Sequence, residues 1–223
     1  MQIDLILPVN NNNILSKSAI EQLNLPTDIC CTIKLPNNDL TEINSQEDEL
    51  QATPSIIEAI KHSAKQGSDA VIVYCFGEPG VKQARQEVNI PVFGIASPAM
   101  HTASLLDKQF SVIASIDTHC PLIKDLAQQF KLVSQMEEPI SINISPNSIS
   151  NSNDLINTDV LNQIRHAIEI KKVEAFILGC GSMQGKSNYV AQVIKQQLGY
   201  NITIIDPLPT AIYMSYSVVH MGY

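Results

Sequence analysis

The sequence predicts an α/β protein built from two similar lobes, each with its own parallel sheet. Apolar runs alternate with stretches of helical periodicity along all 223 residues, which is typical of parallel strands joined by right-handed crossovers. The landmarks also repeat in the two halves of the chain: residues 3–9 correspond to 110–114, 70–75 to 175–180, and 91–95 to 203–206. We therefore expect pseudo-symmetric lobes, one from residues 1–97 and 207–223 and the other from residues 98–206.

Each strand of the first half is a short apolar run that ends at a turn. The first run stops at Asn10, and residues 70–74 are continuously apolar, as in a buried parallel strand. Thr53 and Pro54 suit the N-cap and first turn of a helix, and Gly67 suits its end. The expected elements, in order, are strands 3–9 and 29–35, helix 55–66, strand 70–74, helix 79–88, strand 91–95 and a helix opened by Ser97 and Pro98.

The second half repeats this order of elements. Gly199 is expected to end one helix and Pro207 to precede the last one. Serine and asparagine are abundant over residues 146–158, which indicates a loop. The expected elements, in order, are strand 110–114, helix 122–130, strand 140–144, helix 161–170, strand 173–178, helix 187–198, strand 202–205 and a final helix.

Charge and composition exclude several classes of partner. The formal net charge is −8 and basic residues do not cluster, so nucleic acid and anionic membranes are poor partners. No apolar run is long enough to span a bilayer, and the start of the chain lacks the basic and apolar regions of a signal peptide. We therefore expect a cytoplasmic protein whose partner is a small-molecule substrate.

The five cysteines do not form a disulfide or metal-binding pattern. Their number is odd and there is no C-x-x-C, so neither a disulfide framework nor a metal site is expected. Cys30 and Cys31 lie inside an expected strand and Cys120 precedes a proline, which favours structural roles for these three. The other two, Cys75 and Cys180, each stand where a buried strand gives way to a tight turn.

A cysteine at the end of a parallel strand is well placed for proton or nucleophilic chemistry. Such sheets bind ligands at the carboxyl ends of their strands, and a helix N-terminus nearby lowers the pKa of a thiol from about 8.5. One thiolate and one thiol on opposite faces of a carbon acid form a two-base racemase without any cofactor. Cys75 and Cys180 are therefore the candidate catalytic pair, in a cleft between the lobes; the alternative is that both pack as small hydrophobic residues.

Small residues beside these cysteines allow the backbone to approach a ligand closely. Gly77, Gly181 and Ser182 are the candidates, and their N–H groups suit a carboxylate or a developing enolate oxygen. Glu78 and Asp117 also lie close enough to expected strand ends to touch a substrate. Helix-terminus electrostatics explains Glu78 equally well.

Longer motifs surround both candidate cysteines. The first reads Cys75-Phe76-Gly77-Glu78-Pro79-Gly80, then Ala84-Arg85, then Pro91-Val92-Phe93-Gly94-Ile95, and the second reads Leu178-Gly179-Cys180-Gly181-Ser182-Met183. Together they resemble the hydantoin racemase branch of the aspartate/glutamate racemase superfamily. The resemblance implies two flavodoxin-like lobes, cofactor-independent racemisation at a carbon next to a carbonyl, and Cys75 and Cys180 as acid and base. It also implies that Phe76 lies at a hydantoin-like ligand and that the protein is a homo-oligomer.

Some positions depart from the pattern of that family. Near the first strand, Pro8 departs and Asn10 matches, as a residue expected to face the substrate. Ser97 stands where the family often has Glu. Ala114 and Ser115 replace a Thr-Thr pair, so Ser115 keeps a hydroxyl group. The substrate therefore stays open between a hydantoin or allantoin and an amino acid such as aspartate or glutamate, and a binding protein that does not racemise is a further alternative.

The sequence leaves two other functions to consider: phosphate binding by the second motif, and another reaction of the same superfamily. Residues 180–187 nearly match the phosphate loop G-x-x-x-x-G-K-S between a strand and a helix, but Cys180 stands at the first glycine. Decarboxylases of the superfamily use one cysteine, and maleate isomerases use cysteine as a nucleophile. Retention of both cysteines argues against a decarboxylase.

Overall fold

The computed structural model contains two separate parallel sheets. It describes residues 1–11, 14–149 and 155–222. The chain divides into two compact units, called here unit 1 (Met1–Pro98 with Leu208–Tyr223) and unit 2 (Ala99–Pro207). Each unit holds one of the sheets.

The sheet of unit 1 is wholly parallel. Its strands are β1 (Gln2–Ile6), β2 (Cys30–Lys34), β3 (Ala70–Val73) and β4 (Val92–Phe93), in the order β2-β1-β3-β4. Its helices are α1 (Lys17–Glu21), α2 (Gln46–Lys65), α3 (Val81–Ala84) and α9 (Pro207–His220), while α4 (Ala96–Leu105) leads into unit 2.

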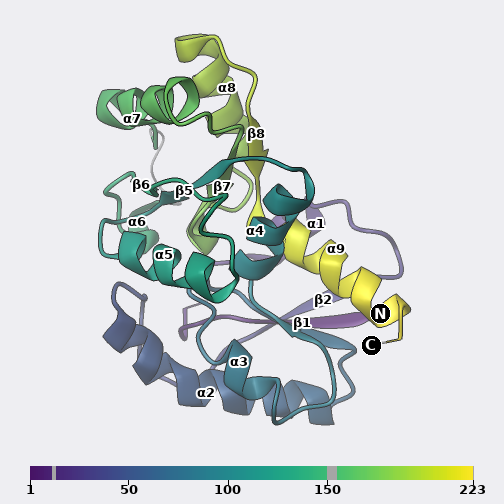
Figure 1. Cartoon of the computed structure of the whole chain (residues 1–223). Coiled ribbons are helices and arrows are strands. Elements are labelled where there is room, and N and C mark those ends of the chain that lie inside the picture. The colour runs from purple at the N-terminus through teal and green to yellow at the C-terminus, as the bar shows by residue number, and fades with distance from the viewer. Residues whose placement is uncertain (12–13, 150–154, 223) are drawn as a thin grey trace. The chain divides into compact units, whose positions relative to one another are not determined.

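Helices cover both faces of this sheet (Figure 1). On one side, Ile56 and Ile60 of α2 join Val71 and Val73 of β3 in one hydrophobic cluster. On the other side lies α9, where Ile212 is fully buried. Because β3 is covered on both faces, all of its residues are buried, which explains its continuously apolar sequence.

The sheet of unit 2 is also wholly parallel. Its strands are β5 (Phe110–Ala114), β6 (Ile140–Ser141), β7 (Ala175–Leu178) and β8 (Thr203–Ile205), in the order β6-β5-β7-β8. Its helices are α5 (His119–Gln129), α6 (Pro146–Ile149), α7 (Thr158–Glu169), α8 (Ser187–Leu198) and the short 3₁₀ helix η1 (Gly181–Met183). The strand order repeats that of unit 1, so the predicted α/β class with two similar parallel sheets is confirmed.

Helices again lie on both faces of the sheet of unit 2. Ile164 of α7 and Ile194 of α8 share a hydrophobic cluster with Phe176 and Leu178 of β7. Figure 1 shows α5 on the opposite side of β5. Both units therefore leave the carboxyl ends of their strands at the rim of a covered sheet, where ligands of such sheets bind.

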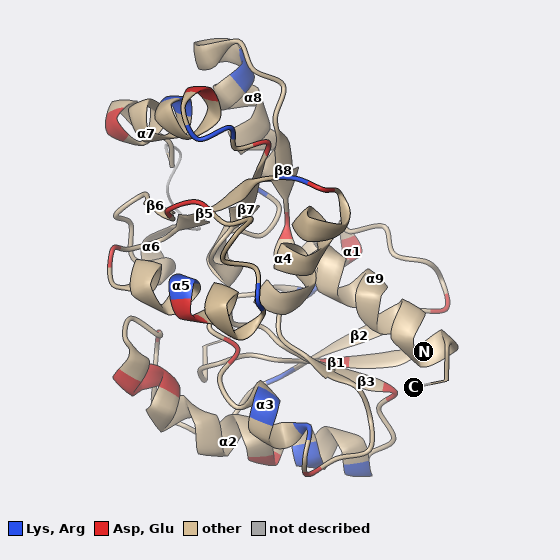
Figure 2. Cartoon of the chain, in the orientation of Figure 1, with Lys and Arg blue, Asp and Glu red and all other residues tan. Residues whose placement is uncertain are grey.

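The longest helix begins earlier than the sequence predicts. α2 starts at Gln46 rather than at residue 55, because Ser45 caps it by accepting a hydrogen bond from the Asp48 N–H. Three acidic residues in its first turn also suit the helix dipole, and Figure 2 shows them at one end of α2. Pro54 lies inside the helix, where its missing N–H removes one backbone hydrogen bond without ending the helix.

Several other expected elements also change in length or type, including the strands expected over 91–95 and 140–144, which are reduced to Val92–Phe93 and Ile140–Ser141. The expected helix over 79–88 is reduced to the four residues of α3, and the expected strand over 3–9 already ends at Ile6. Within the expected loop over 146–158, Pro146–Ile149 form the helix α6, because the backbone closes a turn there despite the polar composition. Residues 150–154 of that segment lie outside the described residues.

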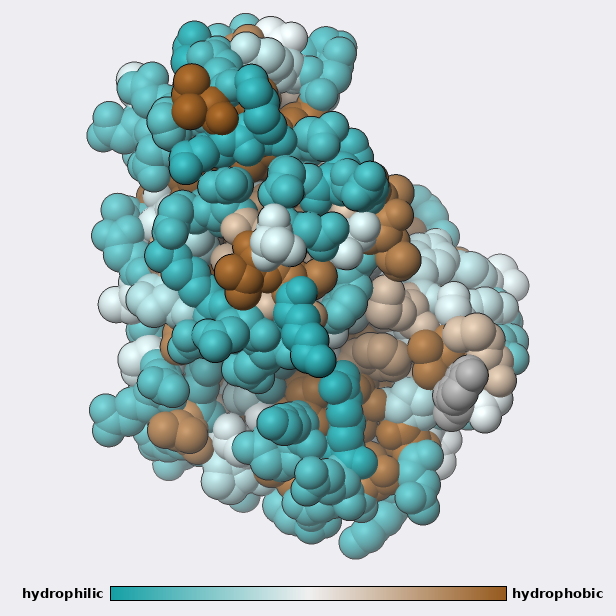
Figure 3. All heavy atoms as spheres, viewed as in Figure 1, coloured by the Kyte–Doolittle hydropathy of each residue, from teal (hydrophilic) through white to brown (hydrophobic). Residues whose placement is uncertain are grey.

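Helix length and surface hydropathy bear on contact with a membrane. Within the described ranges, no helix combines the length and the apolar character needed to cross a bilayer. On the face drawn in Figure 3, hydrophilic residues predominate and hydrophobic side chains show in small groups. Single exposed residues such as Leu105 and Ile170 are ordinary features of a protein surface.

Candidate functional site

Cys75 lies just beyond the carboxyl end of β3 in unit 1. Val73 is the last residue of β3 and pairs with Ile6 of β1, and the N–H of Tyr74 donates to the Ile6 carbonyl oxygen at 2.8 Å. Cys75 follows this last bond, and its carbonyl oxygen accepts from the Glu78 N–H at 3.1 Å, which closes a turn. The residue is half-buried and packs against the hydrophobic cluster of unit 1.

Cys180 has the equivalent position in unit 2. Leu178 pairs with Ile113 of β5, and the N–H of Gly179 donates to the Ile113 carbonyl oxygen at 2.8 Å. The Cys180 carbonyl oxygen accepts from the Met183 N–H at 3.0 Å. Leu178, Gly179, Cys180 and Met183 each lie 105 positions after the residue with the same role around Cys75 (180 minus 75). The two cysteines therefore end equivalent strands with equivalent turns.

Neither cysteine is followed at once by a long helix. Glu78 and Gly80 have φ angles of 55° and 77°, in the left-handed region, so a right-handed helix cannot start at Pro79 and α3 begins only at Val81. Cys180 leads into η1, and α8 begins seven residues later, at Ser187 (187 minus 180), with Lys186 as its N-cap. Neither turn therefore places the N-terminus of a long helix directly at its cysteine.

Hydroxyl and amide groups of unit 2 surround the Cys180 thiol instead. Burial raises the pKa of this thiol above its ordinary value of 9.0, because a thiolate would lose its water. Hydrogen bonds from the N–H and the hydroxyl of Ser182 and from the hydroxyl of Ser115 favour the thiolate and oppose that rise. The structure thus brings together three residues that the sequence predicts for the site: Cys180, Ser115 and Ser182.

His119 extends this group and was not singled out by the sequence. Its Nδ1 atom lies 2.8 Å from the hydroxyl oxygen of Ser115. Ser115 is fully buried just after β5, and His119 is the first residue of α5. The only signal in the sequence was the spacing of four residues across a strand–helix turn, which is too common to indicate a contact.

In unit 1, a carboxyl group from α2 lies against Gly77. A Cβ atom at Gly77 would overlap the Glu49 carboxylate, so glycine is what lets this group come so close to the backbone. Burial, and secondarily the charge of Asp48, raises the pKa of Glu49 to about 7. Glu49 lies 26 positions before Cys75 (75 minus 49), and its contact depends on the early start of α2 that the sequence did not predict.

A second carboxyl group of unit 1 lies in the turn after Cys75. Glu78 accepts a hydrogen bond from the Ser97 N–H at 2.6 Å, at the start of α4. A Cβ atom at Gly94 would overlap its side chain, so the carboxyl group is enclosed by backbone. Burial raises the pKa of Glu78 to about 7, although the Ser97 N–H, the charge of Arg85 and the Ala96 N–H act in the opposite direction.

The remaining predicted residues lie at strand ends in different settings. Asn10 is exposed, four residues after the end of β1 (10 minus 6). Phe76, the residue after Cys75, is only 5% exposed, so its ring is buried. Gly181 opens η1 and is half-buried. All of these residues keep the predicted place after a parallel strand.

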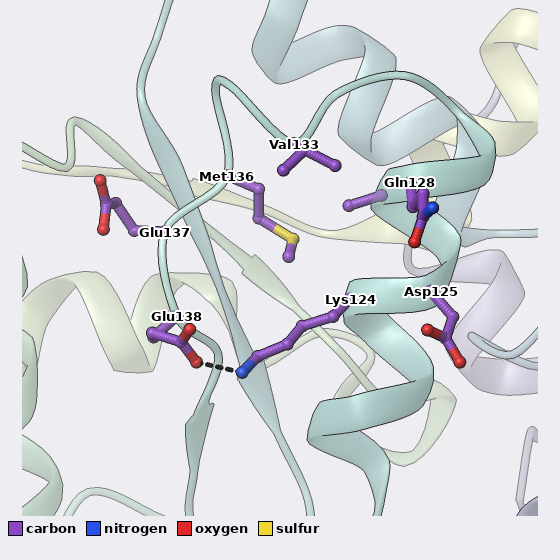
Figure 4. A pocket seen from close by; sticks show the side chains of 8 residues that line it. Lys124, Asp125, Gln128, Val133, Met136, Glu137 and Glu138 are labelled. Carbon is purple, nitrogen blue, oxygen red and sulfur yellow. Dashed lines mark ion pairs between the residues drawn. The ribbon is translucent and has the colours of Figure 1, made fainter.

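Two cavities lie away from the predicted residues. One of about 210 Å³ lies beside α5 in unit 2, and Figure 4 shows its lining, with the ion pair between Lys124 and Glu138 across it. Another of about 640 Å³ lies in unit 1 between the end of β2 and α2, with Lys34 and Glu58 among its lining residues. Neither cavity is lined by a residue of the two cysteine motifs.

The geometry of residues 180–187 does not suit a phosphate. The N–H of Gly185, which would face the anion in a phosphate loop, donates to the Asp206 carboxylate at 2.7 Å. A fixed negative charge therefore stands where a phosphate would bind. Over the ranges that the structure describes, His, Cys, Asp and Glu side chains do not gather in threes or more in a way that could hold a metal ion.

Comparison with known proteins identifies relatives in sequence and in structure. The family model described as Asp/Glu/Hydantoin racemase matches residues 25–214. A hydantoin racemase of Pseudomonas sp. (strain NS671) is 27% identical over 190 residues, 84% of this chain and 73% of that protein. A hydantoin racemase of Paenarthrobacter aurescens is 24% identical over 223 residues, 98% of this chain and 92% of that protein.

Solved structures show the same fold. The allantoin racemase of Pseudomonas fluorescens superposes with a TM-score of 0.86 at 22% identity, covering 100% of this chain and 92% of that one. Glutamate racemase of Francisella tularensis superposes with a TM-score of 0.66 at 12% identity, covering 99% and 81%. The family match spans most of the chain, including both cysteine motifs, so the chain belongs to the Asp/Glu/hydantoin racemase family and is, as predicted, an isomerase.

Proposed function

We propose that this protein is a cofactor-independent racemase in which Cys75 and Cys180 act as the acid and the base. The observation that carries the proposal is the equivalence of the two cysteines: each is the second residue after the last paired residue of its strand, with the same backbone bond before it and the same turn after it. A pair of groups with the same chemistry in equivalent frames is what a reaction with two mirror-image directions requires.

The chemistry assigns each thiol a role in each direction. For one enantiomer, a thiolate removes the proton from the carbon next to a carbonyl, and the other thiol delivers a proton to the opposite face. For the other enantiomer the roles exchange. Between these steps the substrate carries an enolate oxygen, and N–H groups in the turns at Gly77 and Gly181 are of the kind that stabilise such a charge.

We infer that the substrate is a hydantoin or allantoin. After the first cysteine, Phe76-Gly77 matches the hydantoin-type motif, and after the second, Gly181-Ser182 resembles its Ala-Gly; aspartate and glutamate racemases usually carry Asn-Thr or Thr-Glu there. The relatives in sequence are named hydantoin racemases and similar structures include allantoin racemases, which supports the same substrate class. A homo-oligomeric state in the cytoplasm stays a prediction, which sedimentation velocity and fractionation would test.

A deuterium-exchange screen tests this function. The protein is incubated in deuterated water with single enantiomers of hydantoins, allantoin, aspartate and glutamate, and both the deuterium content and the enantiomer ratio are followed. We expect exchange and racemisation of a hydantoin-type compound. Exchange only with aspartate or glutamate would instead identify an amino-acid racemase, and no exchange with any compound would favour a binding protein.

Cysteine variants test the mechanism in the same assay. Cys75→Ala and Cys180→Ala should each abolish racemisation while leaving exchange of one enantiomer, a different one in each variant, because one base remains. Cys120→Ala serves as the matched control, since Cys120 lies in α5 outside both motifs, and should racemise like the wild type. Full two-way activity of Cys75→Ala or Cys180→Ala would disprove the pair.

A further inference from the structure

A chain of three polar side chains runs through the carboxyl end of the sheet of unit 2. The Cys180 thiol is hydrogen-bonded to the Ser115 hydroxyl, and the Ser115 oxygen lies 2.8 Å from Nδ1 of His119. Ser115 is fully buried, so its hydroxyl group forms its hydrogen bonds with Cys180 and His119 rather than with bulk water. His119 is half-buried at the start of α5.

The number of protons in this chain decides what each group can do. A serine hydroxyl has one proton and can both donate and accept. When Ser115 donates this proton to the Cys180 sulfur, its oxygen is available as an acceptor. An N–H at Nδ1 of His119 then donates to that oxygen, and the hydroxyl proton is held toward the sulfur. This arrangement favours the thiolate, because a charged acceptor gains most from a fixed donor.

We propose that His119 is a positioning residue that acts through Ser115 to hold a hydrogen bond on the Cys180 sulfur and so to favour its thiolate. The inference deepens the proposed function, on which its catalytic meaning rests, because Cys180 must be a thiolate whenever it acts as the base. It does not require His119 to touch a substrate.

The sharpest test compares two substitutions of similar size at His119. In His119→Asn the amide nitrogen stands near the position of Nδ1 and still donates to Ser115, whereas His119→Leu offers no donor. The matched control is His166→Leu, which removes an exposed histidine from α7 of the same unit. The readout is the rate at which iodoacetamide alkylates Cys180 at pH 7, followed by mass spectrometry, with Cys75 as the internal reference.

Loss of the donor should slow the alkylation of Cys180. When the thiolate fraction falls about tenfold, each remaining thiolate becomes about threefold more reactive, so the rate should fall about threefold. In His119→Asn and in His166→Leu, iodoacetamide should alkylate Cys180 at the wild-type rate. An unchanged or faster rate in His119→Leu, or a rate in His119→Asn as slow as in His119→Leu, would overturn the proposal.

A double variant tests whether the effect passes through Ser115. In a Ser115→Ala background the connection is already broken, so adding His119→Leu should cause no further slowing. A further threefold loss there, about the size expected for the single variant, would show that His119 acts by another route and would overturn the positioning role. Faster alkylation of Cys75 would reveal general unfolding in any variant, and the His119→Asn comparison keeps the test decisive in that case.

The exchange assay separates this inference from the proposed function. In Cys75→Ala, where Cys180 is the remaining base, adding His119→Leu should slow the surviving deuterium exchange about threefold. In Cys180→Ala, where Cys75 is the remaining base, adding His119→Leu should leave the exchange rate unchanged. Equal slowing in both backgrounds would overturn the inference. If alkylation responds as expected but no compound exchanges, the hydrogen-bond chain is real and the proposed function is wrong.

Discussion

Replacing Glu78 by glutamine should remove a pH-dependent loss of stability from unit 1. Burial raises the pKa of the Glu78 carboxyl group from an ordinary value of 4.5 to about 7 in the folded protein. Between these values the folded state keeps a proton that the unfolded state has released, so the free energy of unfolding falls as the pH rises. The loss begins near the lower value and is complete above the upper one.

The size of the effect follows from the two pKa values. A difference of 1 between the folded and unfolded pKa corresponds to about 1.4 kcal/mol, and integration from pH 5 to pH 8 gives a loss of about 2.5 kcal/mol. Glutamine has no proton to release over this range. Its side-chain oxygen can still accept the Ser97 N–H, which lies 2.6 Å from Glu78 Oε1, so the packing at the start of α4 is preserved.

Urea denaturation at pH 5 and pH 8 measures the effect. The stability of Glu78→Gln relative to the wild type should rise by about 2.5 kcal/mol between the two pH values. Glu47→Gln is the control, because Glu47 is exposed in the first turn of α2, and its difference from the wild type should stay constant. If the Glu78→Gln difference is equally constant, the carboxyl group is not desolvated in the folded protein and the reasoning fails.

Three further changes have expected outcomes. Ser45→Ala should lower the free energy of unfolding by about 1 kcal/mol, because the N-cap bond to the Asp48 N–H is lost; an unchanged urea midpoint would show that the cap contributes nothing. Gly179→Ala should cost about 1–3 kcal/mol, because its Cβ would lie 2.9 Å from the Ile113 carbonyl oxygen and β5 would have to shift; calorimetry should show a lower Tm, and a wild-type Tm would contradict this. Dialysis against EDTA should leave racemisation intact, and activity that disappears and returns with added metal would contradict a cofactor-independent mechanism.

The fold could be predicted where local sequence decides the structure. The strand over Phe110–Ala114 and the helix over Ser187–Leu198 have the predicted bounds, because an apolar run and an amphipathic stretch with Gly199 at its end leave few alternatives. The start of α2 could not be predicted from Pro54, since a proline suits a first turn but is also tolerated inside a long helix that packs on a sheet.

In the candidate site, too, only the residues whose surroundings are set by local sequence could be predicted. The positions of Cys75 and Cys180 could be predicted because each directly follows a continuous apolar run and precedes the small residues of a turn, in matching places of the two halves. Glu49 and His119 could not: Glu49 reaches Gly77 only through the packing of α2, and the spacing of four residues between Ser115 and His119 is too common to indicate a contact. Side chains that tune a reactive group are often of this second kind.

The return of the chain to unit 1 through α9 has a consequence for the order of folding during synthesis. Leu208, Ala211 and Ile212 of this helix are buried, and the helix belongs to unit 1, whereas all of unit 2 precedes it in the chain. Every residue of unit 2 has therefore left the ribosome before unit 1 receives its last helix. Unit 2 can fold while the apolar surface of unit 1 that packs against Leu208, Ala211 and Ile212 is still exposed, and that surface is the one a chaperone would have to shield.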